Sequence, residues 1–294
     1  MIYEKNRLSM EEFVKKIIFS VLAVFALLIT SGANAKSIKI GTEGAYPPWN
    51  NLNSAGELEG AEIDFGNEAC KRMGADCEWV TQDWDGIIPA LLNGKYDIII
   101  AGMSITEERK KKVNFTNGYM TDGIRFAALK SSNLGSIGSN WSGSQTKKVD
   151  LSNPSAKELA AIAQINTALQ DKIVGAQGAT THQNYVEKYM QGVVEIRLYQ
   201  TMDALHLDLA AGWIDAAIGA VGSLLDFMST ELGKGIAMFG PNLSGDVLGE
   251  GVGGAVRKED TDILEMWNKA IAEMSAYGTT AKITKKWFGR DVSL

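Results

Sequence analysis

Residues 96–101 read Tyr-Asp-Ile-Ile-Ile-Ala, and this run decides the fold. Three consecutive isoleucines leave neither face of a strand polar, so the run predicts a strand buried on both sides, as in a parallel sheet covered by helices. Residues 85–92 carry apolar side chains at helical spacing, and Asn93-Gly94 ends that pattern. A helix followed by a buried strand is the repeating unit of an α/β fold.

The alternation continues from this run toward the N-terminus. Ser37–Ile40 and Cys77–Thr81 are predicted strands, and Glu62–Met73 has the apolar spacing of a helix between them. The order strand, helix, strand, helix, strand predicts a parallel sheet with helices on its faces.

A second α/β series follows the hydrophobic segment Gly123–Leu129. Helices and strands are predicted in alternation at Ser155–Gln170, Lys172–Gln177, Thr180–Met190, Val194–Tyr199, Thr201–Ala211 and Ile214–Ala220, and two helices, Asp260–Ala276 and Thr279–Phe288, come last. We therefore expect two lobes, with residues 36–121 and 250–294 in the first and residues 122–249 in the second. Ligand groups are expected in the cleft between them, at the carboxyl ends of the strands.

Residues 1–35 are expected to be a signal peptide. Basic residues precede the uncharged run Ile17–Ile29, and Ala33-Asn34-Ala35 has the small-residue pattern of a cleavage site. A membrane anchor is the alternative, but the run is shorter than the roughly 20 residues that span a bilayer. We therefore expect the chain to be exported and cleaved.

The composition is that of a globular protein. The chain has 294 residues, of which 45% are hydrophobic and 22% charged, and its formal net charge is −6. These values exclude disorder and a multi-span membrane protein. They also argue against nucleic acid as a partner, because binding to a phosphate backbone needs a basic surface.

The chain has two cysteines and two histidines. In an oxidising compartment Cys70 and Cys77 most simply form one disulfide, and their spacing is not the C-x-x-C of redox catalysis. A structural metal site is disfavoured, because His182 and His206 are scattered along the chain. We expect His182 to be exposed on a helix, with a pH-sensitive ligand group as the alternative, and His206 to be structural.

An acid and aromatic residues follow the predicted strands of the first series. Glu43, Tyr46 and Trp49 come after the first strand, and Trp84 comes after the second. Aromatic side chains mostly serve packing, which is the alternative for Tyr46 and Trp49. Together, these residues at successive strand ends favour a pocket for a cation.

Arg109 is the predicted anchor for an anion. It follows the third strand, in the first turn of a helix that Thr106 is placed to cap. The helix dipole favours anions rather than cations at that end, so the arginine has no local structural reason to be there. A guanidinium group can hold a carboxylate in a bidentate pair, and this is the role that we expect. The following lysines, 110–112, are expected to be solvated.

In the second series, Thr180 and Thr181 open a helix directly after a strand. Backbone N–H groups and hydroxyls at such a start can bind an anion, while Thr180 caps the helix. The glycine-rich run Gly249–Gly254 departs from the spacing of a dinucleotide-binding loop and is predicted to be a flexible return to the first lobe. Within it, Glu250 is a candidate cleft residue. Residues 131–147 are predicted to be a flexible surface excursion.

These motifs resemble, in order and over nearly the whole mature chain, the polar amino-acid-binding proteins of ABC importers. The resemblance is carried by Glu43–Trp49, Leu58–Asp64, Cys70–Cys77, Trp84–Pro89, Met103–Arg109, Gly178–Thr181, Leu209–Ala216 and Arg257–Asp260. It implies a type II periplasmic binding protein, in which a hinge of two crossovers closes two lobes on a ligand.

The resemblance also implies roles for individual residues. Arg109 would hold the ligand α-carboxylate, Tyr46 and Trp84 would sandwich the ligand side chain, and Glu43 would face a distal cation. The whole ligand-binding set expected is Glu43, Tyr46, Trp84, Ala101, Gly102, Ser104, Arg109, Ala179, Thr180, Thr181 and Ala220.

Ala220 departs from the family pattern, which has an acid for the ligand α-amino group at this position. A buried ammonium group without its partner loses about 2–5 kcal/mol of binding free energy. Opines such as octopine and nopaline carry a secondary amine and an extra carboxylate, so the missing acid would harm their binding less. The pattern at Glu43–Asn50 and the insertion Ser131–Asp171 are similar to those of opine binders.

The expected function is to capture a polar or basic amino acid or an arginine-derived opine and to deliver it to an ABC permease in the inner membrane. We expect a monomer without cofactor or metal. Two alternatives share the fold: an exported dehydratase, with Glu43 or Glu250 as the acid, and a sensor that presents its closed form to a receptor. The enzyme is disfavoured, because the sequence offers no nucleophile with its base.

Overall fold

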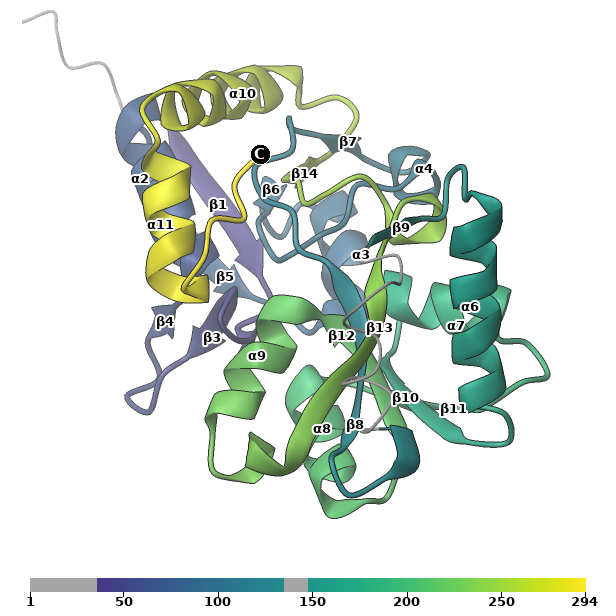
Figure 1. The fold of residues 1–294 in the computed structure, drawn as a ribbon. Helices are drawn as coiled ribbons and strands as arrows, with labels where there is room; N and C mark the ends of the chain where they lie inside the picture. The colour runs from purple at the N-terminus through teal and green to yellow at the C-terminus, as the bar shows by residue number, and fades with distance from the viewer. Residues whose placement is uncertain (1–35, 135–147) are drawn as a thin grey trace, which may run out of the picture. The chain divides into compact units, whose positions relative to one another are not determined.

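The computed structural model describes residues 36–134 and 148–294 (Figure 1). The predicted signal peptide, and residues 135–147 of the predicted surface excursion, lie outside the described residues. No helix within the described ranges combines the length and the apolar character that a membrane span requires.

The first sheet forms around the three isoleucines. Its strand order is β5 (Asp76–Thr81), β1 (Ser37–Thr42), β6 (Ile98–Ile99), β14 (Ala255–Val256) and β7 (Asn114–Phe115). As predicted, β1 pairs in parallel with β5 and β6, whereas β14 runs antiparallel to β6 and β7. Tyr96 and all three isoleucines are fully buried, but only Ile98 and Ile99 are in strand conformation.

Helices α2 (Ala61–Met73), α10 (Thr261–Ala276) and α11 (Thr279–Phe288) pack against one another beside β1 (Figure 1). A short helix, α3 (Ile87–Leu92), contacts β1 and β6, and the 3-10 helix η1 (Trp84–Gly86) leads into it. A small sheet, β2 (Ala45–Tyr46), β3 (Asn50–Leu52) and β4 (Leu58–Glu59), lies between β1 and α2 in the chain.

The predicted disulfide is confirmed. Cys70 near the end of α2 is bonded to Cys77 in β5, and Gly74 between them ends the helix in the left-handed conformation with φ 62°. The bond therefore fastens the helix to the edge strand of the first sheet.

The second sheet has the order β11 (Glu195–Tyr199), β10 (Ile173–Gln177), β12 (Ala216–Ala220), β8 (Ile124–Leu129), β13 (Ile236–Ser244) and β9 (Lys148–Asp150). The three predicted strands β11, β10 and β12 are parallel, and β8 runs antiparallel to β12. Strand β13 was not predicted, because Gly240 and Pro241 interrupt its apolar pattern. Its pairing with β8 shifts register between Phe239 and Leu243.

The helices of the second series are α6 (Ala156–Ala168), α7 (Thr181–Tyr189), α8 (Met202–Ala211) and α9 (Val221–Ser229). The first three begin at side-chain caps provided by Ser155, Thr180 and Thr201, which is why their predicted starts agree with the structure. Helix α9 was not predicted. Two 3-10 helices, η2 (Leu232–Gly235) and η3 (Asp246–Leu248), flank β13.

Two segments connect the sheets, and they lie side by side. The first runs from β7 to β8 and the second from β13 to β14. Met120 in the first bridges Val252 in the second: the Val252 N–H donates to the Met120 carbonyl at 2.8 Å. The run Gly249–Gly254 is thus the return to the first sheet, as predicted, and hydrogen bonds hold it there.

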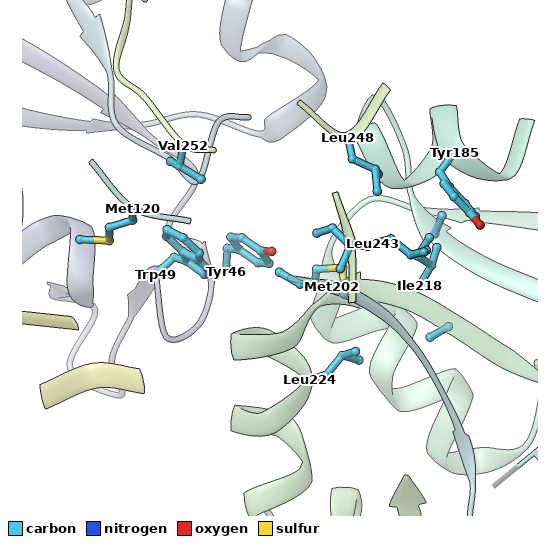
Figure 2. Close-up of a cluster of buried hydrophobic side chains, with 14 of the residues drawn as sticks. Tyr46, Trp49, Met120, Tyr185, Met202, Ile218, Leu224, Leu243, Leu248 and Val252 are labelled. Carbon is cyan, nitrogen blue, oxygen red and sulfur yellow. The ribbon is translucent and has the colours of Figure 1, made fainter. Parts of the chain in front are cut away.

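Buried side chains of both sheets belong to one hydrophobic cluster. Figure 2 draws Trp49 and Tyr46 next to each other, with the Tyr46 hydroxyl directed toward Met202 and Leu243 from the second series. Helix α8, which contains Met202, contacts β2, which contains Tyr46. The ends of the strands that the sequence singled out therefore meet.

Candidate functional site

A cavity of about 530 Å³ is lined by residues of both sheets. All the predicted ligand-binding residues except Ala179 line it, namely Glu43, Tyr46, Trp84, Ala101, Gly102, Ser104, Arg109, Thr180, Thr181 and Ala220. Residues from distant parts of the sequence are thus brought to one place, and their roles toward a ligand remain predictions.

Arg109 lies in α4 (Glu107–Lys110), which Thr106 caps as predicted: the Thr106 Oγ1 accepts the Arg109 N–H at 3.2 Å. The guanidinium group donates to the Ser104 carbonyl at 3.0 Å and to the Ala179 carbonyl at 3.5 Å. Burial lowers the pKa of Arg109 to about 10, which leaves it charged at neutral pH. No carboxylate in the described ranges forms an ion pair with it. The positive charge of Arg109 is therefore not compensated by a carboxylate of the described chain.

Trp84 contacts both Arg109 and the second sheet. The Arg109 guanidinium carbon lies 5.3 Å from the centre of the Trp84 ring, and the Trp84 Nε1–H donates to the Ala179 carbonyl at 3.1 Å. Ala179 has a positive φ of 56°, a conformation that is uncommon for a residue with a side chain. Ala179 contributes its carbonyl to the link between the two sheets instead of lining the cavity.

Tyr46 stacks on Trp49, with ring centres 6.2 Å apart and planes 3° from parallel. Trp49 in turn meets the edge of Phe288 at 4.9 Å. The packing alternative therefore describes Trp49 well, because it is only 1% exposed. Both Tyr46 and Trp49 also line the cavity.

Glu43 is a buried acid in the cavity wall. Its Oε1 accepts a hydrogen bond at 2.7 Å from Nε2 of Gln177, at the end of β10. Burial raises the pKa of Glu43 to about 7, against the opposing effect of the Gln177 hydrogen bond. Part of the population is therefore neutral at physiological pH, and a cation beside the group would favour the charged form.

Glu62 does not line the cavity but holds neighbouring residues of its wall in place, a role that the sequence did not suggest. Its side chain is fully buried and accepts from the Gly102 N–H at 2.7 Å, from the Tyr119 hydroxyl at 2.5 Å and from the Asn50 amide at 2.8 Å. Gly102 has φ 61°, and a Cβ there would lie 3.0 Å from the Tyr46 ring. The acid thus fixes the backbone next to Tyr46. An acid in the first turn of α2 gave no sign of this, because acids are common there.

Helix α7 begins at the cavity. Thr180 caps it as predicted, accepting the Gln183 N–H at 3.3 Å and donating to the Gln177 carbonyl at 2.6 Å. The expectation that His182 is exposed is wrong: it is 6% exposed and lines the cavity. The ring is buried because α7 begins at the cavity wall, which Thr180, Thr181 and His182 form together. His206 is buried against Phe227, in agreement with a structural role.

Ala220 ends β12 opposite Ile124 of β8 and is 4% exposed. Beyond this pair lies Asp122, which also lines the cavity and was not predicted. Its carboxylate pairs with Arg290 and accepts the Gly222 N–H of α9 at 2.6 Å. Asp122 therefore has partners within the chain, whereas Arg109 lacks a carboxylate partner.

Glu250 lines the cavity, as the sequence suggested, and its carboxylate lies 3.7 Å from the Lys110 ammonium group. Lys110 also pairs with Glu107 at 2.7 Å, so this lysine is part of a surface charge network. Within the described ranges no group of three or more histidine, cysteine, aspartate or glutamate side chains could hold a metal ion.

Two α/β sheets joined by paired crossovers, with a charged cavity between them, define a type II periplasmic binding protein. The chain belongs to the bacterial extracellular solute-binding proteins, family 3, whose family description matches residues 38–290. The family and the fold class predicted from the sequence are both confirmed.

Named relatives of the chain are binding proteins. The octopine-binding periplasmic protein of Rhizobium meliloti is 35% identical over 92% of this chain and 96% of its own length. The L-arginine-binding protein of Pseudomonas aeruginosa is 34% identical over 95% of this chain and 98% of its own. The solved structure of an ancestral arginine-binding protein bound to arginine has a TM-score of 0.71 and 31% identity, over 86% of this chain and 98% of that one.

Proposed function

We propose that the chain captures a polar or basic amino acid, or an arginine-derived opine, and delivers it to the permease of an ABC importer without chemical change. The observation that carries this proposal is the guanidinium group of Arg109 in the cavity. Its hydrogen bonds go to two backbone carbonyls, and no carboxylate of the described chain neutralises it. A ligand carboxylate would supply the missing charge in a bidentate pair.

The cavity also selects for a cation on the ligand. Glu43 is buried and has one amide donor, so its ionised form is poorly compensated. A guanidinium or ammonium group on the ligand would stabilise that form. The two charged residues thus favour a ligand that carries a carboxylate and a cation. Arginine and octopine, for which two of the relatives are named, are ligands of this kind.

Ala220 widens the choice to ligands with a substituted amine. It offers no charge to a ligand ammonium group, and its partner across the sheet, Ile124, is apolar and also lines the cavity. An opine, whose amine is secondary, would lose less from the missing acid than a free amino group would. Octopine and nopaline therefore belong in any ligand panel.

Residues 36–121 and 250–294 would act as one lobe and residues 122–249 as the other. Ligand binding would shift the population from an open to a closed form, which the permease would recognise. We further propose that residues 1–35 export the chain and that it works as a monomer in the periplasm, in keeping with relatives named as periplasmic.

Calorimetry with arginine, lysine, ornithine, histidine, octopine and nopaline tests the ligand class. We expect at least one of them to bind, and Arg109→Ala to abolish measurable binding. The apo melting temperature of that variant should be nearly unchanged, because Arg109 has no internal ion pair to lose. Silence toward all six ligands would overturn the proposal, and a large loss of apo stability in the variant would show that Arg109 is structural.

A further inference from the structure

His182 is a buried polar side chain whose position no structural role explains. It is the second residue of α7, lines the cavity with Arg109 and is 6% exposed. The imidazole makes no hydrogen bond to any described residue, and its Nδ1 is enclosed. His206 also has a buried nitrogen without a partner, but only His182 lines the cavity, where a bound molecule can supply one.

The surroundings determine the protonation of the ring. Burial, and secondly the charge of Arg109, lower the pKa of His182 to about 4. At neutral pH the ring therefore has one N–H and one lone pair. A proton on the enclosed Nδ1 would be a buried donor without an acceptor, which costs more than a bare lone pair. The proton consequently belongs on Nε2, the nitrogen that is not enclosed and can meet a molecule in the cavity.

The neighbours decide which kind of ligand atom this N–H would meet. Arg109 repels cations from this part of the cavity, and the start of α7 adds the positive end of a helix dipole. An anionic oxygen is favoured by both. A hydrogen bond from a neutral donor to such an oxygen is stronger than one between neutral groups.

We propose that His182 is a ligand-binding residue whose Nε2–H donates to the carboxylate held by Arg109. This inference rests on the proposed function, and it adds a donor to the carboxylate site, at a residue that the sequence offered as a ligand group only in second place. It assigns the carboxylate end of the ligand to Arg109, His182 and the start of α7. The opposite charge of Glu43 is left for the ligand cation.

Two substitutions test the role of the N–H. His182→Met keeps an apolar volume without a donor, and His182→Gln provides an amide N–H in place of Nε2. With the tightest-binding member of the six-ligand panel, we expect His182→Met to lose about 10- to 100-fold in affinity. His182→Gln should recover most of that loss. An affinity of His182→Met equal to that of the wild type would overturn the inference, and so would an equal loss in both variants.

A ligand pair separates binding from general packing. If arginine is the ligand, the comparison is with the amide of arginine, which lacks the anionic oxygen. His182→Met should then lower the affinity for arginine more than the affinity for the amide. Equal weakening of both would mean that the ring only supports the fold. Silence of the wild-type protein toward all six ligands would be the failure of the proposed function itself.

Nitrogen chemical shifts of the two histidines give a readout that does not depend on affinity. In the unliganded protein we expect the Nε2–H tautomer for His182 at neutral pH, and a shift of that nitrogen when ligand binds. His206 does not line the cavity and is the internal control, whose signals should stay in place. An Nδ1–H tautomer for His182, or no response to a bound ligand, would contradict the proposal.

Discussion

At the scale of the residue, Glu43 shows how burial couples ligand charge to pH. Its pKa is raised from 4.5 to about 7, chiefly by burial. Below this value the group is mostly neutral, and above it a buried negative charge faces the cavity. Asp203, Asp83 and Glu62 raise the pKa further, while the Gln177 hydrogen bond lowers it. A bound cation would favour ionisation and release a proton from the protein.

We predict that the affinity for a cationic ligand increases with pH. Below the pKa of Glu43 the gain should approach about tenfold per pH unit, and it should level off above about pH 7. Calorimetry with arginine between about pH 5.5 and pH 8 measures this, and Glu43→Gln should give a nearly flat profile. A steep profile that survives the substitution would show that another group titrates.

The same shift has a consequence for the unliganded protein. Because the folded-state pKa of Glu43 lies above the unfolded value, ionisation opposes folding. The free energy of unfolding should therefore fall as pH rises from about 4.5 to about 7, by about 3 kcal/mol for this group alone. Denaturation at both ends of this range measures this. The free energy of unfolding of the wild type should fall below that of Glu43→Gln mainly at the higher pH.

His182 and Ala179 show what the sequence could not reveal about the site. The other candidate residues line the cavity, and their roles toward a ligand stay predictions. Local pattern indicated Glu43, Trp84 and Arg109, whereas Ala101, Gly102 and Ala220 came from the resemblance. Whether a helical side chain at a given position is exposed depends on the opposite sheet, which a local pattern does not contain. For the same reason nothing indicated that Ala179 would offer its carbonyl to Trp84 and Arg109.

At the scale of the element, the parallel strands that alternate with helices were predictable, whereas the antiparallel strands and the edge strand β9 were not. Strands β1, β5, β10, β11 and β12 have apolar runs and helices between them. Strand β13 contains Gly240 and Pro241, and β14 follows a glycine-rich stretch, so neither has a strand pattern. Both exist because they pair with residues far away in the sequence, β13 with β8 and β14 with β6 and β7.

The disulfide between Cys70 and Cys77 leads to an element-scale prediction. It closes a short loop from α2 to β5, with a sequence separation of 7. In the chain-entropy model such a loop contributes about 2–3 kcal/mol to the free energy of unfolding. Urea denaturation of a variant with both cysteines changed to alanine should show this loss. Its ligand affinity should equal that of the wild type, because neither residue lines the cavity. A weaker affinity would mean that loss of the bond displaces α2, and with it Glu62 and Gly102.

At the scale of the whole molecule, two kinds of connection join the sheets. The paired crossovers at Met120 and Val252 are covalently continuous with both sheets, so they persist whatever the distance between the lobes. The hydrogen bonds from Trp84 to Ala179 and from Gln177 to Glu43 lie across the cavity and are lost if the lobes separate. The balance between open and closed forms therefore depends on these hydrogen bonds, on the contact between α8 and β2, and on the ligand.

We predict that Trp84→Phe shifts the unliganded protein toward the open form. The variant keeps an aromatic ring beside Arg109, and it loses the N–H that the Ala179 carbonyl accepts together with part of the indole packing. One such hydrogen bond contributes about 0.5–1.5 kcal/mol, so ligand affinity should fall by about 2- to 10-fold. Small-angle scattering should give a larger radius of gyration than that of the wild type without ligand, and the two should converge when ligand saturates both.

Trp213→Phe is the matched control, because that indole is 68% exposed and lies outside the cavity. If both variants scatter and bind as the wild type does, the Trp84 contact does not govern closure, and the crossovers or the ligand alone must set the distance between the lobes.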